Sequence, residues 1–481
     1  MTAGTPREPA PLYLAGQWVA DGVALPVRAA GTDRVIGATF EATAAQLEEA
    51  TAAAVQAFAT TRRSSSHERG AILRRAGEFL LEDADEIGAL LAEEIGKPLA
   101  DATLEVRRTA LVFRIAAEEA ERLGGEVLPL DQLATSGGRW GMTRRVPLGP
   151  VAAIAPFNVP LSLAAHKVAP ALAAGNTVVL KPDSRVALTS LRMAAVLDRA
   201  GVPRGALSVL PMSVEVADAM VTDDRYRALS FTGSARVGWQ LRARAGTKKV
   251  VLELGGNGPV VVDETADVEA AAARTVKGAF KYAGQLCISV QRAFVHRSVH
   301  ARFVELVAHG AEQLRLGDPL AEGTDVGPMI DEAAARRAEE VIAEAVEHGA
   351  LVRAGGTRDG AFVAPTVLEG SPSPARVWRD EVFAPIVAVA PVDDFAEGLG
   401  LADDSPYGLQ AGVFTRDLHR AMAAFDGLDT GAVLINDVPT FRVDNMPFGG
   451  SKASGLGREG VRYALEDLTE LRLLVLGADG F

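Results

Sequence analysis

Residues 151–182 read VAAIAPFNVPLSLAAHKVAPALAAGNTVVLKP, and this stretch decides the fold class. Two short apolar runs, 151–155 and 177–180, flank a segment with helical periodicity, and each run ends in a turn signal. Runs of the same kind occur at 207–210, 228–231 and 250–254. Strands that alternate with helices are typical of βαβ crossovers, so we predict an α/β protein with a parallel sheet. Ligands usually bind at the carboxyl ends of such strands.

The flanking sequence extends this organisation. Residues 41–123 carry the spacing of successive amphipathic helices, and a second α/β alternation covers about 260–434. Its expected helices are listed here: 268–282, 300–314 and 331–348. The apolar run at 468–476 would expose an unpaired edge alone, so we expect it to pair with 138–146 or with a second subunit.

Composition excludes several classes of function. The chain has 481 residues and a net charge of −13, which disfavours nucleic acid or an anionic membrane as the main partner. No apolar run reaches the roughly 18 residues that cross a bilayer, and the first residues lack a signal-peptide pattern. One cysteine makes neither a disulfide nor a thiolate metal site. We expect a cytoplasmic enzyme without a metal.

Two residues have chemistry that the surrounding sequence leaves open. A lone cysteine such as Cys287 is more often a buried small hydrophobe than a nucleophile, although Gly284 would permit close approach of a ligand. Glu253 ends an apolar run, where a carboxyl has either a buried ion-pair partner or a raised pKa that suits a general base.

Polar residues follow three more of the predicted strands. Asn158 offers an amide to an oxyanion or serves as a turn residue, and Lys181 offers an ammonium to a ribose hydroxyl or is a surface charge. Gly233 and Ser234 stand at a strand-to-helix junction, which suits a pyrophosphate or is an ordinary helix cap.

Taken together, the ordered motifs resemble those of the aldehyde dehydrogenase superfamily from about residue 13 to 474. The motifs, in chain order, are Pro156-Phe157-Asn158, Lys181-Pro182, Phe231-Thr232-Gly233-Ser234, Glu253-Leu254-Gly255-Gly256, Gly284-Gln285-Leu286-Cys287, Glu381-Val382-Phe383-Ala384-Pro385 and Pro447-Phe448-Gly449-Gly450-Ser451-Lys452.

The resemblance implies a three-part fold and a homodimer or homotetramer. A Rossmann-like NAD(P)-binding domain would comprise 1–125 and 148–252, and an α/β catalytic domain 253–435. A small β bridging arm for oligomerisation would comprise 126–147 and 465–481. Residues 436–464 would return the chain to the cofactor domain.

The resemblance also implies a mechanism. The thiolate of Cys287 attacks the aldehyde, Asn158 and the Cys287 backbone N–H hold the oxyanion, and hydride passes to NAD or NADP. Glu253 then activates the water that hydrolyses the thioester, and Glu459 shares its proton path. The implied cofactor contacts are Lys181, Ser184, Gly233, Ser234, Glu381 and Phe383.

The cofactor motif departs from the NAD-preferring pattern. Many relatives have an acidic residue two positions after the Lys-Pro pair, where this chain has Ser184. Serine removes a charge that would repel a 2′-phosphate, and Arg185 is nearby, whereas Asp183 preserves a place for NAD. We expect activity with both cofactors.

Residues 284–292 and 436–444 look like the branch of lactaldehyde and other small, polar or anionic aldehyde dehydrogenases. Arg442 with Arg107 or Arg108 would clamp an anion such as a carboxylate or phosphonate, or would make ordinary ion pairs. The apolar Val159 and Leu286 disfavour a strongly anionic substrate. We therefore expect a small hydroxy- or acid-bearing aldehyde.

Two alternative functions follow from the same residues. A CoA-acylating semialdehyde dehydrogenase would transfer the acyl group to CoA, but such relatives tend to lack the base glutamate that Glu253 supplies. A cofactor-binding protein without turnover would be expected to have lost one of Cys287, Glu253 or Asn158.

Overall fold

The computed structural model describes residues 9–477. The first eight residues of the expected cofactor domain and the last four of the expected arm lie outside this range. Between residues 9 and 477, no helix combines the length and apolar character that crossing a membrane requires.

A first sheet of eight strands has the order β2-β1-β9-β8-β7-β10-β11-β23. Its strands are β1 (Leu12–Leu14), β2 (Gln17–Val19), β7 (Pro150–Ile154), β8 (Thr177–Lys181), β9 (Leu207–Val209), β10 (Ala228–Thr232), β11 (Lys249–Glu253) and β23 (Gly455–Leu456). Strands β7 to β11 are parallel, which confirms all five strands predicted there. The strand order reverses between β7 and β10, where ligands bind in such sheets.

Helices cover both faces of this sheet, because successive residues of its strands are apolar and point to opposite faces. Val151 and Ala153 pack with α2, α4, α5 and α6, whereas Ala152 packs on the opposite face with α1 and α7. The helices are α1 (Ala44–Thr61), α2 (Ser66–Glu82), α3 (Ala84–Ile95), α4 (Leu99–Arg122), α5 (Pro160–Ala174), α6 (Ala187–Ala200), α7 (Val214–Thr222) and α8 (Ala235–Arg244). Every residue of α5 is buried, so the helix between β7 and β8 forms the centre of this core.

A second sheet of seven strands has the order β14-β17-β18-β13-β12-β20-β21. Its strands are β12 (Gly258–Val262), β13 (Val290–His296), β14 (Leu351–Ala354), β17 (Thr366–Glu369), β18 (Ile386–Val392), β20 (Gln410–Phe414) and β21 (Ala432–Ile435). The helices of this part are α9 (Val268–Phe280), α10 (Arg297–Glu312), α11 (Glu332–Glu347), α12 (Arg376–Arg379), α13 (Phe395–Asp403) and α14 (Leu418–Gly427). The three helices predicted here are therefore confirmed as α9, α10 and α11.

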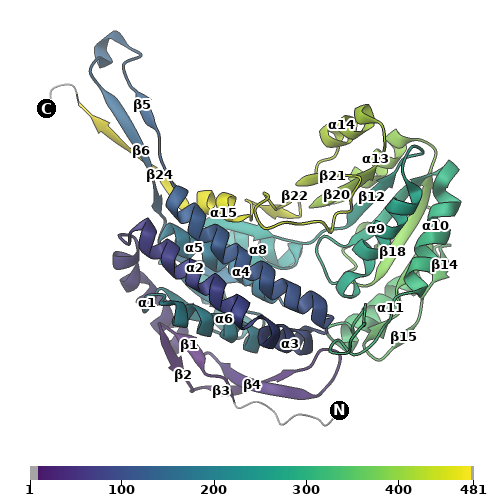
Figure 1. Ribbon diagram of the computed structural model, residues 1–481, viewed down its shortest axis with the longest axis horizontal. Coiled ribbons are helices and arrows are strands. Elements are labelled where there is room, and N and C mark those ends of the chain that lie inside the picture. Colours follow the sequence, from purple (N-terminus) through teal and green to yellow (C-terminus); the bar gives the residue numbers. More distant parts are fainter. Residues whose placement is uncertain (1–8, 478–481) are drawn as a thin grey trace.

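A third sheet projects from the rest of the molecule as an arm (Figure 1). It consists of β5 (Val127–Pro129), β6 (Trp140–Pro147) and the last strand, β24 (Thr469–Leu476). β24 runs antiparallel to β6 from Thr469 opposite Pro147 to Leu476 opposite Trp140, which confirms the predicted pairing of the tail.

The remaining elements are short. Three two-stranded sheets pair β3 (Val23–Arg28) with β4 (Val35–Glu41), β15 (Arg358–Asp359) with β16 (Phe362–Val363), and β19 (Tyr407–Gly408) with β22 (Ser451–Lys452). After β21, the chain returns to the first sheet, where β23 pairs with β11, and α15 (Val461–Asp467) leads to the arm. Glu253, at the end of β11, lies opposite Gly455 of this returning segment.

Candidate active site

Cys287 lies in the loop between a 3₁₀ turn (Lys281–Gly284) and β13, partly accessible from two cavities. A larger cavity of about 450 Å³ extends along the carboxyl ends of β7, β8 and β10. A smaller cavity of about 120 Å³ lies on the other side of the cysteine. The two share Cys287, Asn158 and Leu163 as lining residues, so the cysteine stands where they meet.

The loop that presents Cys287 has a strained backbone. Tyr282, Ala283 and Gly284 have φ values of 50°, 51° and 66°, a left-handed conformation that side chains disfavour. A Cβ on Gly284 would collide with the carbonyl oxygen of Ala384, next to Phe383, which also has positive φ. Such strain persists only where the surroundings enforce it, and it often marks a functional loop.

Asn158 places an amide donor beside the cysteine loop. Its Nδ2 donates to the carbonyl of Gln285 over 2.9 Å. Because an amide nitrogen has two hydrogens, the second can serve a ligand oxygen. α5 begins at Pro160, and Glu105 of α4 accepts hydrogen bonds from the backbone N–H groups of Leu161 and Ser162. This buried carboxylate therefore fixes the turn that carries Asn158.

Glu253 is a buried carboxyl. It is 2% exposed, and neither of its oxygens accepts a hydrogen bond from residues 9–477. Burial, followed by the nearby negative charge of Glu459, raises the pKa of Glu253 well above its ordinary value. A carboxyl of this kind is protonated at rest and becomes a strong base when it loses its proton. The alternative of a buried ion pair for Glu253 does not fit its surroundings.

Glu459 has the opposite environment. Its carboxylate is bonded to Lys167 at 3.3 Å and to Arg442 at 3.0 Å. Although burial alone would raise the pKa of Glu459, these two cations lower it to about 2. The structure therefore brings one neutral and one ionised carboxyl together behind the cysteine.

Sequence reasoning missed Lys167 and its neighbour His166. Both are buried in α5, and Lys167 also donates to Thr232 at 2.6 Å. His166 contacts Asp444 at 3.3 Å through Nε2. The signal was present, because these are titratable side chains in an otherwise apolar helix.

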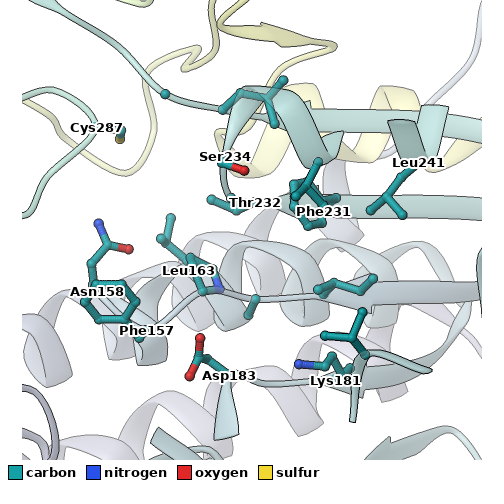
Figure 2. A pocket seen from close by; sticks show the side chains of 18 of the residues that line it. Phe157, Asn158, Leu163, Lys181, Asp183, Phe231, Thr232, Ser234, Leu241 and Cys287 are labelled. Carbon is teal, nitrogen blue, oxygen red and sulfur yellow. The ribbon is translucent and has the colours of Figure 1, made fainter. Parts of the chain in front are cut away.

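The larger cavity collects most of the predicted cofactor residues. Figure 2 shows Cys287 and Asn158 at one end and Lys181 and Leu241 toward the other. The predicted residues that line it are Lys181, Gly233, Ser234, Glu381 and Phe383. Ser184 lies one residue beyond Asp183, which also lines it.

The lining of this cavity fits a dinucleotide. Burial lowers the pKa of Lys181, and Ser234 precedes the first turn of α8, whose free N–H groups suit a phosphate. Glu381 accepts a hydrogen bond from the Gly256 N–H at 3.2 Å, and a Cβ on Gly255 would collide with its carboxyl. Burial raises the pKa of Glu381 to about 7.

Asp183 and Arg185, which both line this cavity, form a bidentate ion pair. The guanidinium donates over 2.9 and 2.8 Å to the two carboxylate oxygens. Arg185 also lies 4.3 Å from the ring centroid of Phe157, which meets Phe383 edge-on. Both charges therefore lie beside the cavity, and each neutralises the other.

The smaller cavity contains two of the three predicted arginines. Arg442 and Arg108 line it, and both also line an outer chamber of about 1180 Å³. The guanidinium carbon of Arg442 lies 3.8 Å from the ring centroid of Phe448. Arg108 forms an ion pair with Asp444 at 2.7 Å. Arg107 is not brought to the site, because its side chain is 62% exposed and its guanidinium lies 3.8 Å from Asp85.

Comparison with known proteins was made on sequence and on structure. The model described as "Aldehyde dehydrogenase family" matches residues 18–474. A 3-sulfolactaldehyde dehydrogenase of Priestia megaterium is 42% identical over 99% of this chain and 100% of its own. Aldehyde dehydrogenase 21 of Physcomitrella patens, solved with the product succinate, has a TM-score of 0.96 at 41% identity, covering 99% and 100% of the two chains. An NADP-dependent glyceraldehyde-3-phosphate dehydrogenase of Bacillus halodurans, solved with NADP, has a TM-score of 0.95 at 36% identity, covering 98% and 99%.

Proposed function

The chain belongs to the aldehyde dehydrogenase family, and on this premise we propose that it oxidises a small polar or anionic aldehyde to the carboxylate with NAD or NADP. The observation that carries the proposal is the position of the sole cysteine, partly accessible where two cavities meet and beside the Asn158 amide. A nucleophile between a cofactor cavity and a substrate cavity is what this oxidation requires.

The larger cavity would hold the cofactor through Lys181, Glu381, Phe383 and the turn at Gly233 and Ser234. When bound, the nicotinamide supplies the acceptor for the hydride that leaves the aldehyde carbon. Phe383, Gly255 and Cys287 line the same cavity, so a nicotinamide bound there would lie close to the cysteine.

Cys287 acts first as an acid and then as a nucleophile. Burial, followed by the charge of Glu381, raises its pKa to about 12, so the resting group is a thiol. Its proton must therefore leave before attack. Glu253, after it has lost its own proton to solvent, is a base near enough for its charge to affect this pKa. The thiolate bonds to the aldehyde carbon, and the oxyanion accepts from Asn158 and the Cys287 N–H.

Once the thiol proton has passed from Glu253 to solvent, Glu253 completes the cycle by taking a proton from the water that attacks the thioester. Its oxygens are free of hydrogen bonds from described residues, so nothing has to be broken before it accepts a proton. Hydrolysis releases the carboxylate and restores the thiol. The presence of this base favours hydrolysis over transfer to CoA, and the alternative of a non-catalytic protein has no lost catalytic residue to support it.

Cofactor choice depends on Asp183, Ser184 and Arg185. An ionised Asp183 accepts from a ribose hydroxyl, whereas Arg185 pairs with a 2′-phosphate once it turns from Asp183. We propose activity with both cofactors. NADP efficiency below about one per cent of that with NAD, roughly 2.7 kcal/mol of discrimination, would contradict this interpretation of Ser184.

We also propose that Arg442 helps to bind an anionic aldehyde. Its buried Nε donates no hydrogen bond to residues 9–477 and belongs to a side chain that lines the substrate cavity. Arg442→Ala should raise KM for an anionic aldehyde and spare a neutral one of similar size. Equal effects on both substrates would contradict the assignment.

The division of labour in the fold is likewise a proposal. The first sheet, with 1–125 and 148–252, would bind the cofactor, and residues 253–435 would carry the catalytic cysteine. The arm, 126–147 and 465–481, would join subunits into a homodimer or homotetramer. The return segment, 436–464, would complete the substrate cavity with Arg442 and Phe448.

The direct test is a panel of aldehydes run with NAD and with NADP, followed by absorbance of the reduced cofactor, beside a Cys287→Ala control. We expect turnover with small polar or anionic members and none in the control. Intact-mass spectrometry of Glu253→Gln should reveal an acyl adduct on Cys287, with kcat lower by roughly 10²–10⁴. Undiminished turnover by Cys287→Ala would overturn the proposal, and an acyl-CoA product on adding CoA would replace it with the acylating alternative.

A further inference from the structure

The small cavity beside Cys287 is lined by an unusual number of charges for its size. Its volume is about 120 Å³, compared with about 450 Å³ for the cofactor cavity. The charged lining residues are Lys97, Asp101, Glu105, Arg108, Lys281 and Arg442. A substrate in this space would meet their summed charge at close range, because little water fits between.

Each lining cation has a carboxylate partner. Lys97 bonds to Glu105, and Lys281 lies 2.9 Å from Asp101. Arg108 holds Asp444 with two hydrogen bonds of 2.7 and 3.1 Å.

The fourth pair is different because it has a second cation behind it. Arg442 lies 3.0 Å from Glu459, and the same carboxylate lies 3.3 Å from Lys167. The side chain of Lys167 is fully buried, and that of Arg442 is 10% exposed, so solvent screens neither well. One carboxylate therefore serves two cations.

The other titratable groups of this cluster are uncharged. Glu253 is buried and its oxygens accept no hydrogen bond from described residues, which is the environment of a protonated carboxyl. His166 is buried, with Nδ1 bonded to no described residue, as expected for a neutral imidazole. The four lining cations, their four carboxylate partners and Lys167 therefore sum to one positive charge; Glu381 is not part of this sum, because it lines the cofactor cavity on the other side of Cys287. Arg458, the next cation, lies outside this set and donates to the carbonyls of Gly450 and Gly457.

We propose that this surplus sets the charge of the substrate, so that the enzyme prefers aldehydes with a single negative charge over neutral and doubly charged aldehydes of the same size. One carboxylate or sulfonate neutralises the cluster. A phosphate or phosphonate dianion leaves an excess negative charge where the thiolate and the oxyanion must form, and a neutral tail leaves the cation unmatched. This inference rests on the proposed aldehyde oxidation and narrows its substrate class.

The first test compares three aldehydes of similar length. They are succinate semialdehyde, its methyl ester and 3-phosphonopropanal, whose phosphonate loses its second proton near neutral pH. We expect kcat/KM for the acid to exceed that for the ester by about tenfold or more. The ratio of phosphonate to acid should fall at least about fivefold between about pH 6 and about pH 8.5, because the dianion replaces the monoanion. An equal rate with the ester, or a flat or rising ratio with pH, would overturn the proposal.

The second test changes the number of carboxylates around the small cavity and so the surplus of positive charge. Asp444→Asn and Asp101→Asn each remove one carboxylate and raise the surplus to two. Both should increase the phosphonate-to-acid ratio at about pH 8.5 by about fivefold or more, whichever pair is broken. Because the Asp101 pair is about one-third exposed, that variant should fold even if the buried Asp444 variant does not. An unchanged phosphonate-to-acid ratio in Asp101→Asn would contradict the proposal that the surplus charge sets the preference.

Asp437→Asn is the matched control. Asp437 belongs to the same returning segment as Asp444, but it pairs with Arg274 at 2.8 Å in the outer chamber, where water screens charge. In this variant the phosphonate-to-acid ratio of kcat/KM should change by less than about twofold. A change as large as that of Asp444→Asn would show that the preference does not depend on the charges around the small cavity alone. Failure of all three aldehydes in the unmodified enzyme would instead contradict the proposed oxidation itself, whereas turnover without charge preference would contradict only this inference.

Discussion

At the scale of single residues, Cys287 has the environment of a protected thiol. Burial, followed by the charge of Glu381, raises its pKa to about 12, and only about 10⁻⁵ of the thiol is then ionised at neutral pH. We expect iodoacetamide to label the cofactor-free protein slowly at pH 7 and about tenfold faster for each pH increase of one. Mass spectrometry reports this residue alone, because the chain has no other cysteine.

The positive charge of Arg442 lowers the pKa of Cys287 and so partly offsets the increase caused by burial. Arg442→Gln should therefore label more slowly at each pH. A rate independent of pH, or a faster one in the variant, would show that the thiol is already ionised in the free protein.

Glu253 should weaken the fold as pH increases. Its pKa is raised above the ordinary 4.5, so above pH 4.5 the folded state keeps a proton that the unfolded chain has lost. Stability from this group is complete below pH 4.5 and is lost as pH rises toward the folded-state pKa. Glu253→Gln lacks the ionisable group and therefore lacks this loss. The Tm of the variant minus that of the wild type should increase from about pH 5.5 to about pH 8.5. A constant difference across this range would contradict the raised pKa.

At the scale of elements, the turn before Cys287 depends on Gly284. Alanine there must adopt positive φ and also displace the Ala384 carbonyl. We expect Gly284→Ala to lose roughly 2–4 kcal/mol of stability and most of its activity, since the cysteine loop has to move. Thermal denaturation and initial rates measure both effects.

Gly246 provides a matched comparison. Its φ is +63°, but an added Cβ would have no described atom within 4 Å. Gly246→Ala should therefore cost only about 1 kcal/mol for the backbone conformation and leave turnover intact. Equal losses in the two variants would mean that φ alone, and not the contact with Ala384, makes Gly284 necessary.

The turn after β8 governs cofactor choice through a pair of charges. Asp183→Asn releases Arg185 from its ion pair, so the NADP-to-NAD ratio of kcat/KM should rise about tenfold. Ser184→Glu introduces a repelling charge beside a 2′-phosphate and should lower the same ratio by about tenfold. Steady-state kinetics with both cofactors tests the pair, and changes in the same direction for both variants would contradict it.

The elements were far easier to predict than the contacts between their side chains. Short apolar runs between helical segments identify β7 to β11, because these strands are buried along nearly their whole length. The sequence could not choose between Arg107 and Arg108, since adjacent helical residues differ by about 100° in direction and both are arginine. The Asp183–Arg185 pair and the shared carboxylate of Glu459 depend on tertiary geometry, which no local pattern encodes.

At the scale of the whole molecule, the arm presents apolar surface that the folded chain leaves uncovered. Leu471 and Leu473 on β24 are 62% and 49% exposed, and one edge of β24 pairs with β6 while the other has no partner among residues 9–477. An exposed apolar edge strand is a site for association with another chain. This supports the proposed homo-oligomer, and we propose the arm as the place of its contact.

Charges on this strand should separate the subunits. The double variant Leu471→Glu and Leu473→Glu removes about 1.5–3 kcal/mol of burial for each leucine and adds repelling charges at the edge. Light scattering should then find a lower mass than for the wild type, whereas Val346→Glu, at an exposed apolar site on α11, should not change the mass. An unchanged mass in the double variant would exclude this strand as the contact. Because the arm extends away from the rest of the molecule, the separated subunits should keep the pH-dependent labelling of Cys287, which distinguishes lost association from unfolding (Figure 1).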